Sequence, residues 1–176
     1  MDKEVETSRL KLRILRPSDA GALELYASDP RVARMTTAIP HPYPPGQAVS
    51  FIARMLSGQT NEYVRAIAMG AEGEDGLMGL VRLRPTDQAQ RAELTFWVAP
   101  AFWGTGYARE SVAAICVSAA EWGIHSLIAK VFQDNEAAKK VLLHNGFSFT
   151  GPGEVFSVSR AAMVPTFNYS KALRGA

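Results

Sequence analysis

The residues best suited to chemistry lie between Glu93 and Glu110, where an alternating segment runs into a glycine turn. The turn contains Gly104 and Gly106, and an apolar pattern typical of a helix follows it. The start of a helix offers backbone N–H groups without internal partners and the positive end of the helix dipole. Glycines let a phosphate approach these groups without meeting a Cβ. The sequence therefore predicts a site for a phosphorylated cofactor.

Length and composition describe one ordinary globular domain. The chain has 176 residues, 47% of them hydrophobic, and a net charge of +2 from basic residues scattered along it. We expect a single domain over residues 1–176 and no duplex nucleic-acid partner, because such binders concentrate their basic residues. No apolar run approaches the ~20 residues of a membrane-spanning helix, and the first residues lack the apolar core of a signal peptide. One cysteine, Cys116, excludes an internal disulfide and favours a cytoplasmic location.

The first half of the chain must supply strands and helices that lead to the turn. Residues 9–15 alternate as a half-buried strand does, and helical patterns follow near residues 18–30 and 47–56. Residues 63–69 and 77–83 read as an antiparallel pair joined by the turn from Gly70 to Gly76. Residues 91–98 form a fourth strand, which places Leu94, Phe96 and Val98 on one face and Glu93 on the other.

The second half alternates between helices and strands. A long helix is expected from about Thr105 to Trp122, then an apolar strand from Leu127 to Phe132 that is covered on both faces. Asp134 caps a further helix from Glu136 to His144. Two strands, 147–149 and 163–171, surround a loop rich in Gly and Ser. The order predicts an α/β (α+β) fold with a mixed, mostly antiparallel sheet of about seven strands and helices on both faces.

A dinucleotide fold also uses a strand, a glycine turn and a helix. Here Arg109 occupies the place of its third glycine, and the turn leaves room for one βαβ unit only. The hairpin-like first half is also wrong for a doubly wound sheet. The dinucleotide interpretation is therefore disfavoured.

Four short motifs stand in order along the chain. The first is Thr7-Ser-Arg-Leu-Lys-Leu-Arg13. The second is Trp103-Gly-Thr-Gly-Tyr-Ala108, followed by Glu110, and the last two are Asn135-Glu-Ala-Ala and Val141-Leu-Leu-His-Asn-Gly-Phe147. Together they resemble the signatures of the GNAT-superfamily N-acetyltransferases of the RimJ/RimL type, the ribosomal-protein N-terminal acetyltransferases, whose acyl-CoA signature matches the glycine motif. The similarity covers nearly the whole chain, and the order and spacing of the four motifs make it specific.

The resemblance implies acetyl-CoA as cosubstrate. Its diphosphate would lie on the helix start, and its pantetheine arm would pair with backbone near Phe96 and Val98, where the fourth and fifth strands of the sheet splay apart. Asn135 would contact the arm from the other wall, and Arg109 either adds charge near a phosphate or is an exposed helix residue. The cofactor-binding residues that the resemblance implies are Phe96, Val98, Trp103, Gly104, Thr105, Gly106, Tyr107, Ala108, Arg109 and Asn135.

Direct transfer of acetyl to a primary amine needs a proton acceptor and a group that holds the thioester oxygen. Glu93 is the predicted general base, since related enzymes carry a glutamate on this strand; the alternative is a solvated residue or an ion-pair partner. The N–H near Val98 is the predicted oxyanion donor. Many relatives place Ser or Tyr as general acid where this chain has Ala138 and Leu142. Water, or a residue such as Tyr107 or Tyr169, would then protonate the thiolate.

The same gap leaves a second function open, a CoA-binding module with little catalysis. The acceptor is either a protein N-terminus or a small amine, and both a monomer and a homodimer fit the sequence. Three scattered histidines (His41, His125 and His144) and one cysteine predict no metal site. Trp97 and Tyr43 are candidate walls of the substrate pocket.

Overall fold

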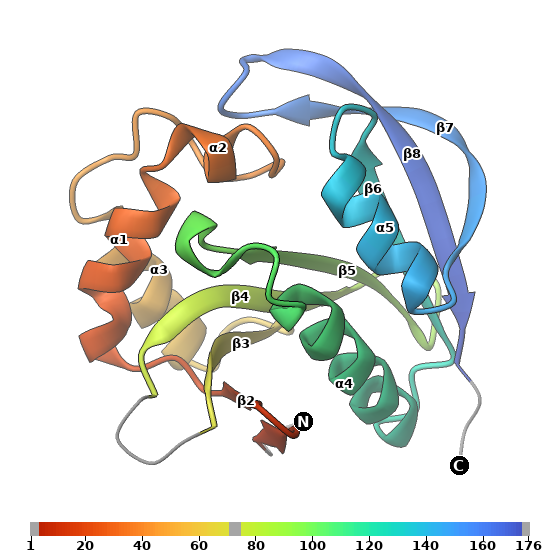
Figure 1. Cartoon of the computed structure of the whole chain (residues 1–176), viewed down its shortest axis with the longest axis horizontal. Helices are drawn as coiled ribbons and strands as arrows, with labels where there is room; N and C mark the ends of the chain where they lie inside the picture. Colours follow the sequence, from red (N-terminus) through yellow and green to blue (C-terminus); the bar gives the residue numbers. More distant parts are fainter. Residues whose placement is uncertain (1–3, 71–74, 174–176) are drawn as a thin grey trace.

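A computed structural model describes residues 4–70 and 75–173 of the chain (Figure 1). The predicted turn from Gly70 to Gly76 lies largely outside these residues. The strands are β1 (Val5–Glu6), β2 (Leu10–Arg13), β3 (Tyr63–Met69), β4 (Leu77–Pro85), β5 (Arg91–Val98), β6 (Ser126–Phe132), β7 (Ser148–Ser157) and β8 (Ala162–Ala172). The helices are α1 (Ala20–Ala27), α2 (Pro30–Ala33), α3 (Gln47–Leu56), α4 (Tyr107–Glu121) and α5 (Glu136–His144), with short 3-10 turns at Pro17–Asp19 and Pro100–Phe102.

The described strands form one eight-stranded sheet in the order β1-β2-β3-β4-β5-β6-β8-β7. Every neighbouring pair is antiparallel except β5 and β6, which run parallel with α4 as their crossover. The mixed, mostly antiparallel sheet is therefore confirmed. β5 and β6 pair only over three positions, ending at Glu93 opposite Ile128, and they diverge beyond that point.

Helices cover both faces of the sheet, as predicted. Buried side chains of α4 and α5, such as Ile115 and Leu142, pack on one face with Leu94 and Val98 of β5. On the other face, α1 and α3 pack over β3 and β4 in a second cluster, against which Trp97 of β5 lies half-buried. Because strand side chains alternate between faces, β5 contributes to both layers. It runs between α4 and the α1–α3 pair (Figure 1).

The last two strands differ from the prediction. The Gly/Ser-rich segment is not a loop, because β7 extends to Ser157 and β8 begins at Ala162. β7 is an edge strand, where Pro152 removes a donor that no neighbouring strand needs. β6 is also not covered on both faces: Leu127 and Ala129 are buried, but Lys130 is exposed.

The turn between β7 and β8, called here the hairpin tip (residues 158–161), reaches back to the segment after α2. The Val158 N–H donates to the Thr37 carbonyl oxygen (3.0 Å), and Arg160 Nε donates to the Arg34 carbonyl oxygen (2.9 Å). Arg160 also forms an ion pair with Asp134, at 2.9 Å. The hairpin tip thus connects the segment after α2 with the residues just before α5.

Candidate active site

The start of α4 presents unpaired backbone donors. Gly106 is the residue before the helix, with φ of 83°, and no side chain caps the helix there. Among the described residues, the N–H groups of Gly104, Thr105, Gly106, Ala108 and Arg109 have no hydrogen-bond acceptor. The turn is exposed and the first helical residues are at most half-buried. Such a row of donors at the positive end of a fifteen-residue helix suits an anion.

The N-terminal motif holds this turn in place. Glu110 accepts hydrogen bonds from Thr7 Oγ1 (2.5 Å) and Arg9 Nε (2.7 Å), and the same arginine donates to the Thr105 carbonyl oxygen (3.0 Å). Burial alone raises the pKa of Glu110, but the bonds from Thr7 and Arg9 outweigh it, so the pKa is lowered. The motif from Thr7 to Arg13 is evident in the sequence, but this function is not, because it depends on contacts between residues about a hundred positions apart.

Backbone groups of β5 face the gap beside β6. The Ala99 N–H donates to the Met78 carbonyl oxygen on β4 (2.8 Å), and hydrogen-bonded pairs alternate along an antiparallel ladder. Trp97 and Thr95 therefore bond toward β4, whereas the N–H groups of Phe96 and Val98 point toward β6. Because β6 has already diverged there, these groups lack a strand partner. The splay predicted between these two strands is confirmed.

Trp103 occupies the mouth of this gap. Its Nε1–H donates to the Val98 carbonyl oxygen at 2.7 Å, and its ring is half exposed. The indole thus satisfies the acceptor of Val98 while the N–H of that residue stays available. On the far side, Gly79 of β4 lies so close that a Cβ there would be 2.2 Å from the Trp97 carbonyl oxygen. The close approach of β4 fixes the path of β5 at this point.

Asn135 lies on the opposite wall of the gap, at the end of β6. Its Oδ1 accepts a hydrogen bond from the Ala138 N–H (3.1 Å), so Asn135 is the N-cap of α5. The prediction that Asp134 caps this helix is wrong, because that carboxylate pairs with Arg160 instead. The cap leaves the Asn135 side-chain NH₂ without an acceptor among the described residues, facing the cleft.

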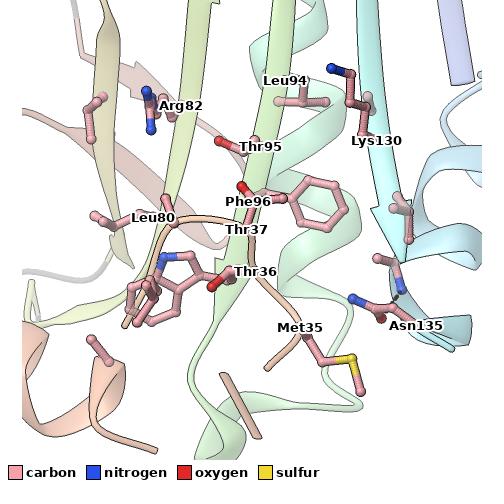
Figure 2. A pocket seen from close by; sticks show the side chains of 18 of the residues that line it. Met35, Thr36, Thr37, Leu80, Arg82, Leu94, Thr95, Phe96, Lys130 and Asn135 are labelled. Carbon is pink, nitrogen blue, oxygen red and sulfur yellow. Dashed lines mark hydrogen bonds between the residues drawn. The ribbon is translucent and has the colours of Figure 1, made fainter. Parts of the chain in front are cut away.

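A cleft of about 200 Å³ joins this gap to the other face of the sheet. Its cofactor half is lined by Phe96, Asn135 and Ala138. Its other half, called here the acceptor half, lies under the segment 35–39 and α3, above the side chains of β4 and β5. Figure 2 shows the segment with Thr36 and Thr37 crossing in front of β5 next to Phe96. Trp97 and Tyr43 line this half, in line with their prediction as candidate walls.

Glu93 lies outside the residues that line this cleft. It is two residues before Thr95 on the same face of β5, and its Oε2 pairs with Arg84 NH2 at 2.5 Å. Its side chain is 13% exposed. Oε1 makes no hydrogen bond with the described residues and remains a free acceptor.

The two positions where relatives carry a general acid hold no donor. Ala138 lines the cleft with a methyl group, and Leu142 is fully buried in the core. Tyr107 and Tyr169 are not among the lining residues. The guanidinium of Arg9 lies over the Tyr107 ring at 4.8 Å, and Tyr169 is 5% exposed within the sheet.

The acceptor half also contains residues that the sequence did not predict. The segment from Met35 to Ile39 forms its roof, and Arg54, Arg82 and Lys130 are cationic side chains along its walls. The signal for Lys130 was its charge within an otherwise apolar strand. The others come from three separate elements, so no local pattern connects them.

The remaining candidates make no second site in the described part of the chain. The three histidines are exposed, and none lines the cleft. Cys116 is buried in the packed face of α4, and burial raises the pKa of its thiol. Residues 4–70 and 75–173 contain no group of three or more His, Cys, Asp or Glu arranged to hold a metal ion. None of the described helices is both long and apolar enough to cross a membrane.

A protein family, a curated relative and solved structures that resemble this chain are all described as acetyltransferases. Residues 9–148 match the family described as acetyltransferase (GNAT) domain. The uncharacterised N-acetyltransferase YoaA of Bacillus subtilis is 30% identical over 151 residues, 84% of each chain. The structure of RimL, a ribosomal L7/L12 alpha-N-protein acetyltransferase bound to coenzyme A, has a TM-score of 0.82 at 16% identity, covering 99% of this chain and 100% of its own. Spermidine N-acetyltransferase from Vibrio cholerae, bound to CoA and spermine, has a TM-score of 0.79 at 18% identity, covering 96% and 98%.

The family match covers most of the chain, including the glycine turn, the splayed strands and the start of α5. The two solved structures share the fold at low identity. The chain therefore belongs to the GNAT family and is an acetyl-CoA-dependent N-acetyltransferase.

Proposed function

We propose that this protein transfers the acetyl group of acetyl-CoA directly to a primary amine, with both substrates bound together in the cleft. The observation that carries this proposal is the presence of two sets of unpaired backbone amides, those of Phe96 and Val98 on β5 and those at the start of α4, the next helix along the chain. The amides of Gly104 to Arg109 match a diphosphate, and the β5 groups match the amides of a pantetheine arm. Asn135 adds a free side-chain NH₂ on the opposite wall.

The chemistry follows from this arrangement. The neutral amine nitrogen attacks the thioester carbon, a C–N bond forms, the C–S bond breaks, and CoA leaves as a thiolate that water protonates. The Val98 N–H holds the thioester oxygen as negative charge develops on it. Glu93 accepts the amine proton through water, using its free Oε1. Trp103 supports Val98 by satisfying the carbonyl of that residue.

The acceptor class is a finer part of the proposal. RimL acts on a protein N-terminus, and the spermidine enzyme acts on a small polyamine, so proteins of this fold acetylate different amines. We assign the chain to the RimJ/RimL-like branch because its Thr7–Arg13 motif engages Glu110 beside the glycine turn. A cytoplasmic location, a homodimer, and the lack of nucleic-acid or membrane partners stay predictions.

The proposed diphosphate site can be tested by comparing substitutions at two glycines that both have a left-handed backbone conformation, Gly106 and Gly123. Gly106→Ala places a Cβ at the start of α4, where φ is 83°, whereas Gly123→Ala places one after the end of the same helix, where φ is 79°. Both variants carry similar strain. We expect Gly106→Ala alone to weaken acetyl-CoA binding by about tenfold, measured by calorimetry. Equal affinity of the two variants would place the diphosphate elsewhere.

A CoA-binding module with little catalysis is the second candidate, favoured by the missing donor at Ala138 and by the buried Leu142. Thiol release from acetyl-CoA across peptides, amino acids and polyamines separates the two functions. Steady release with any of these amines supports the enzyme. Tight acetyl-CoA binding with no release across the whole panel supports the module.

A further inference from the structure

The acceptor half of the cleft is positively charged. Within residues 4–70 and 75–173, its lining includes the cationic side chains of Arg54, Arg82 and Lys130, and no aspartate or glutamate. These cations come from α3, β4 and β6, so they surround the site from three directions. A protonated polyamine entering such a site would meet like charge, whereas a carboxylate or phosphate would meet opposite charge.

The cations are incompletely neutralised by the protein. Arg82 NH2 pairs with Glu62 at 2.5 Å, but its Nε is buried without a hydrogen-bond partner. Lys130 is exposed and makes no hydrogen bond or ion pair with the described residues, and Arg54 lies over the Phe51 ring at 5.6 Å. Among the described residues, Glu62 is thus the one carboxylate that forms an ion pair with any of these three cations.

Two of these cations lie beside the point of transfer. Arg82 is the register partner of Thr95 across β4 and β5. Lys130 is two residues beyond the last β5–β6 pair, Glu93 opposite Ile128, so it lies across the gap from Thr95. Figure 2 shows Arg82 and Lys130 on either side of Thr95, with Phe96 next along β5. A group held between these two cations lies close to where Phe96 and Val98 would present the thioester.

We infer that the acceptor is a primary amine with an anionic group, a carboxylate or a phosphate, close to the amine, and that Lys130 and Arg82 determine this specificity. The inference rests on the proposed acetyl transfer and adds the substrate class. An anion between the two cations would direct the amine toward the splay. The positive surroundings also favour the neutral amine, which is the form that attacks.

The experiment compares acceptors that differ only in charge. Thiol release from acetyl-CoA is measured with Ser-Glu amide and Ser-Gln amide, with 4-aminobutanoate and 4-aminobutanamide, and with spermidine. We expect kcat/KM for each anionic acceptor to exceed that of its neutral partner by about tenfold, and spermidine to be the poorest. The peptide and the small-acid pairs show which source of the anion is preferred.

Variants then test whether the preference for anionic acceptors depends on the cationic side chains of the cleft. Lys130→Met lowers the acid-to-amide ratio of kcat/KM toward one, whereas Lys130→Arg retains the preference. Lys140→Met, which removes a charge from the exposed face of α5, keeps the wild-type ratio. Equal kcat/KM for acid and amide in the wild type, or a preference for spermidine, would overturn the inference while leaving acetyl transfer intact.

If no amine in the panel reacts, the proposed acetyl transfer is contradicted. The preference for an anionic acceptor can then be tested separately by measuring binding. Calorimetry with the CoA-loaded protein then compares Ser-Glu amide with Ser-Gln amide. Tighter binding of the acid, reduced by Lys130→Met, supports the inference. Equal affinities contradict it.

Discussion

The two halves of the cleft differ in the groups that they offer to a substrate. Beside the cofactor half, the free groups are mainly backbone, namely the amides before and within the first turn of α4 and those of Phe96 and Val98. The acceptor half is built from side chains, with Arg54, Arg82 and Lys130 among apolar walls. Backbone groups recognise a constant part of a substrate through geometry, and side chains recognise a variable part through charge and shape. Substitutions should therefore act through backbone position in one half and through charge in the other.

The largest effect is expected at Gly79, which lets β4 approach β5 beside the splay. A Cβ at this position would lie 2.2 Å from the Trp97 carbonyl oxygen and 2.8 Å from the Val98 Cα. Since neither backbone atom can move alone, Gly79→Ala should lower the free energy of unfolding by about 3 kcal/mol. Urea denaturation measures this change, and calorimetry should show weaker acetyl-CoA binding by the folded fraction.

Gly76→Ala is the matched control, because a Cβ there meets nothing within 4 Å. Its free energy of unfolding should change by less than about 0.5 kcal/mol. If Gly79→Ala behaved like this control, the position of β5 would not depend on the close approach of β4. The view that backbone position determines binding beside the cofactor half, in contrast to side-chain charge in the acceptor half, would then lose its main support.

An intermediate effect is expected at Glu93, the carboxylate that accepts the amine proton in the proposed reaction. Glu93→Gln should lower kcat about a hundredfold at neutral pH and recover as pH rises, because more of the amine is then already neutral. Arg84→Met is the control, since it breaks the same ion pair but keeps the carboxylate. A pH–rate profile of kcat distinguishes them, and an unchanged profile in Glu93→Gln would remove this residue from the proton path.

The smallest effect is expected at Glu110, whose bonds to Thr7 and Arg9 hold the glycine turn in place. The lowered pKa of Glu110 means that its contribution to stability is present above the unfolded value of 4.5 and is lost as pH falls through the folded pKa. Glu110→Gln should cost about 1 kcal/mol at pH 7, and this difference should shrink toward pH 3. Denaturation across this pH range measures it. The exposed Glu121→Gln should show no such trend, and a pH-independent loss in Glu110→Gln would mean that the charge is not what holds Arg9.

The glycine turn and the face of β5 could be predicted from the sequence more fully than the acceptor half, for a physical reason. A left-handed backbone requires glycine, so Gly104 and Gly106 mark the turn within a few residues. Strand alternation likewise placed Phe96 and Val98 on one face of β5. The charges of the acceptor half become neighbours only when α3, β4 and β6 are assembled, and no local pattern encodes that assembly.

Two local predictions also failed where distant contacts decide. Asp134 stands one residue before the N-cap, and its carboxylate pairs with Arg160 of the hairpin tip, while Asn135 takes the capping position. The glycines and serines near the end of the chain suggested a loop, yet pairing with β8 holds residues 148–157 in a long edge strand. In both cases the β7–β8 hairpin supplied the partner that the local sequence lacked.

Because the β7–β8 hairpin is bonded to both walls of the cleft, a change in the width of the cleft should alter the hydrogen bonds of the hairpin tip. Arg160 contacts Arg34 on the acceptor side and Asp134 beside Asn135, so one side chain spans from wall to wall. A substrate that wedges the walls apart must stretch this bridge, together with the bond from the Val158 amide to Thr37. The rate of deuterium uptake at the Val158 amide would then report how often the cleft opens. A ligand that draws the two walls together would lower this rate.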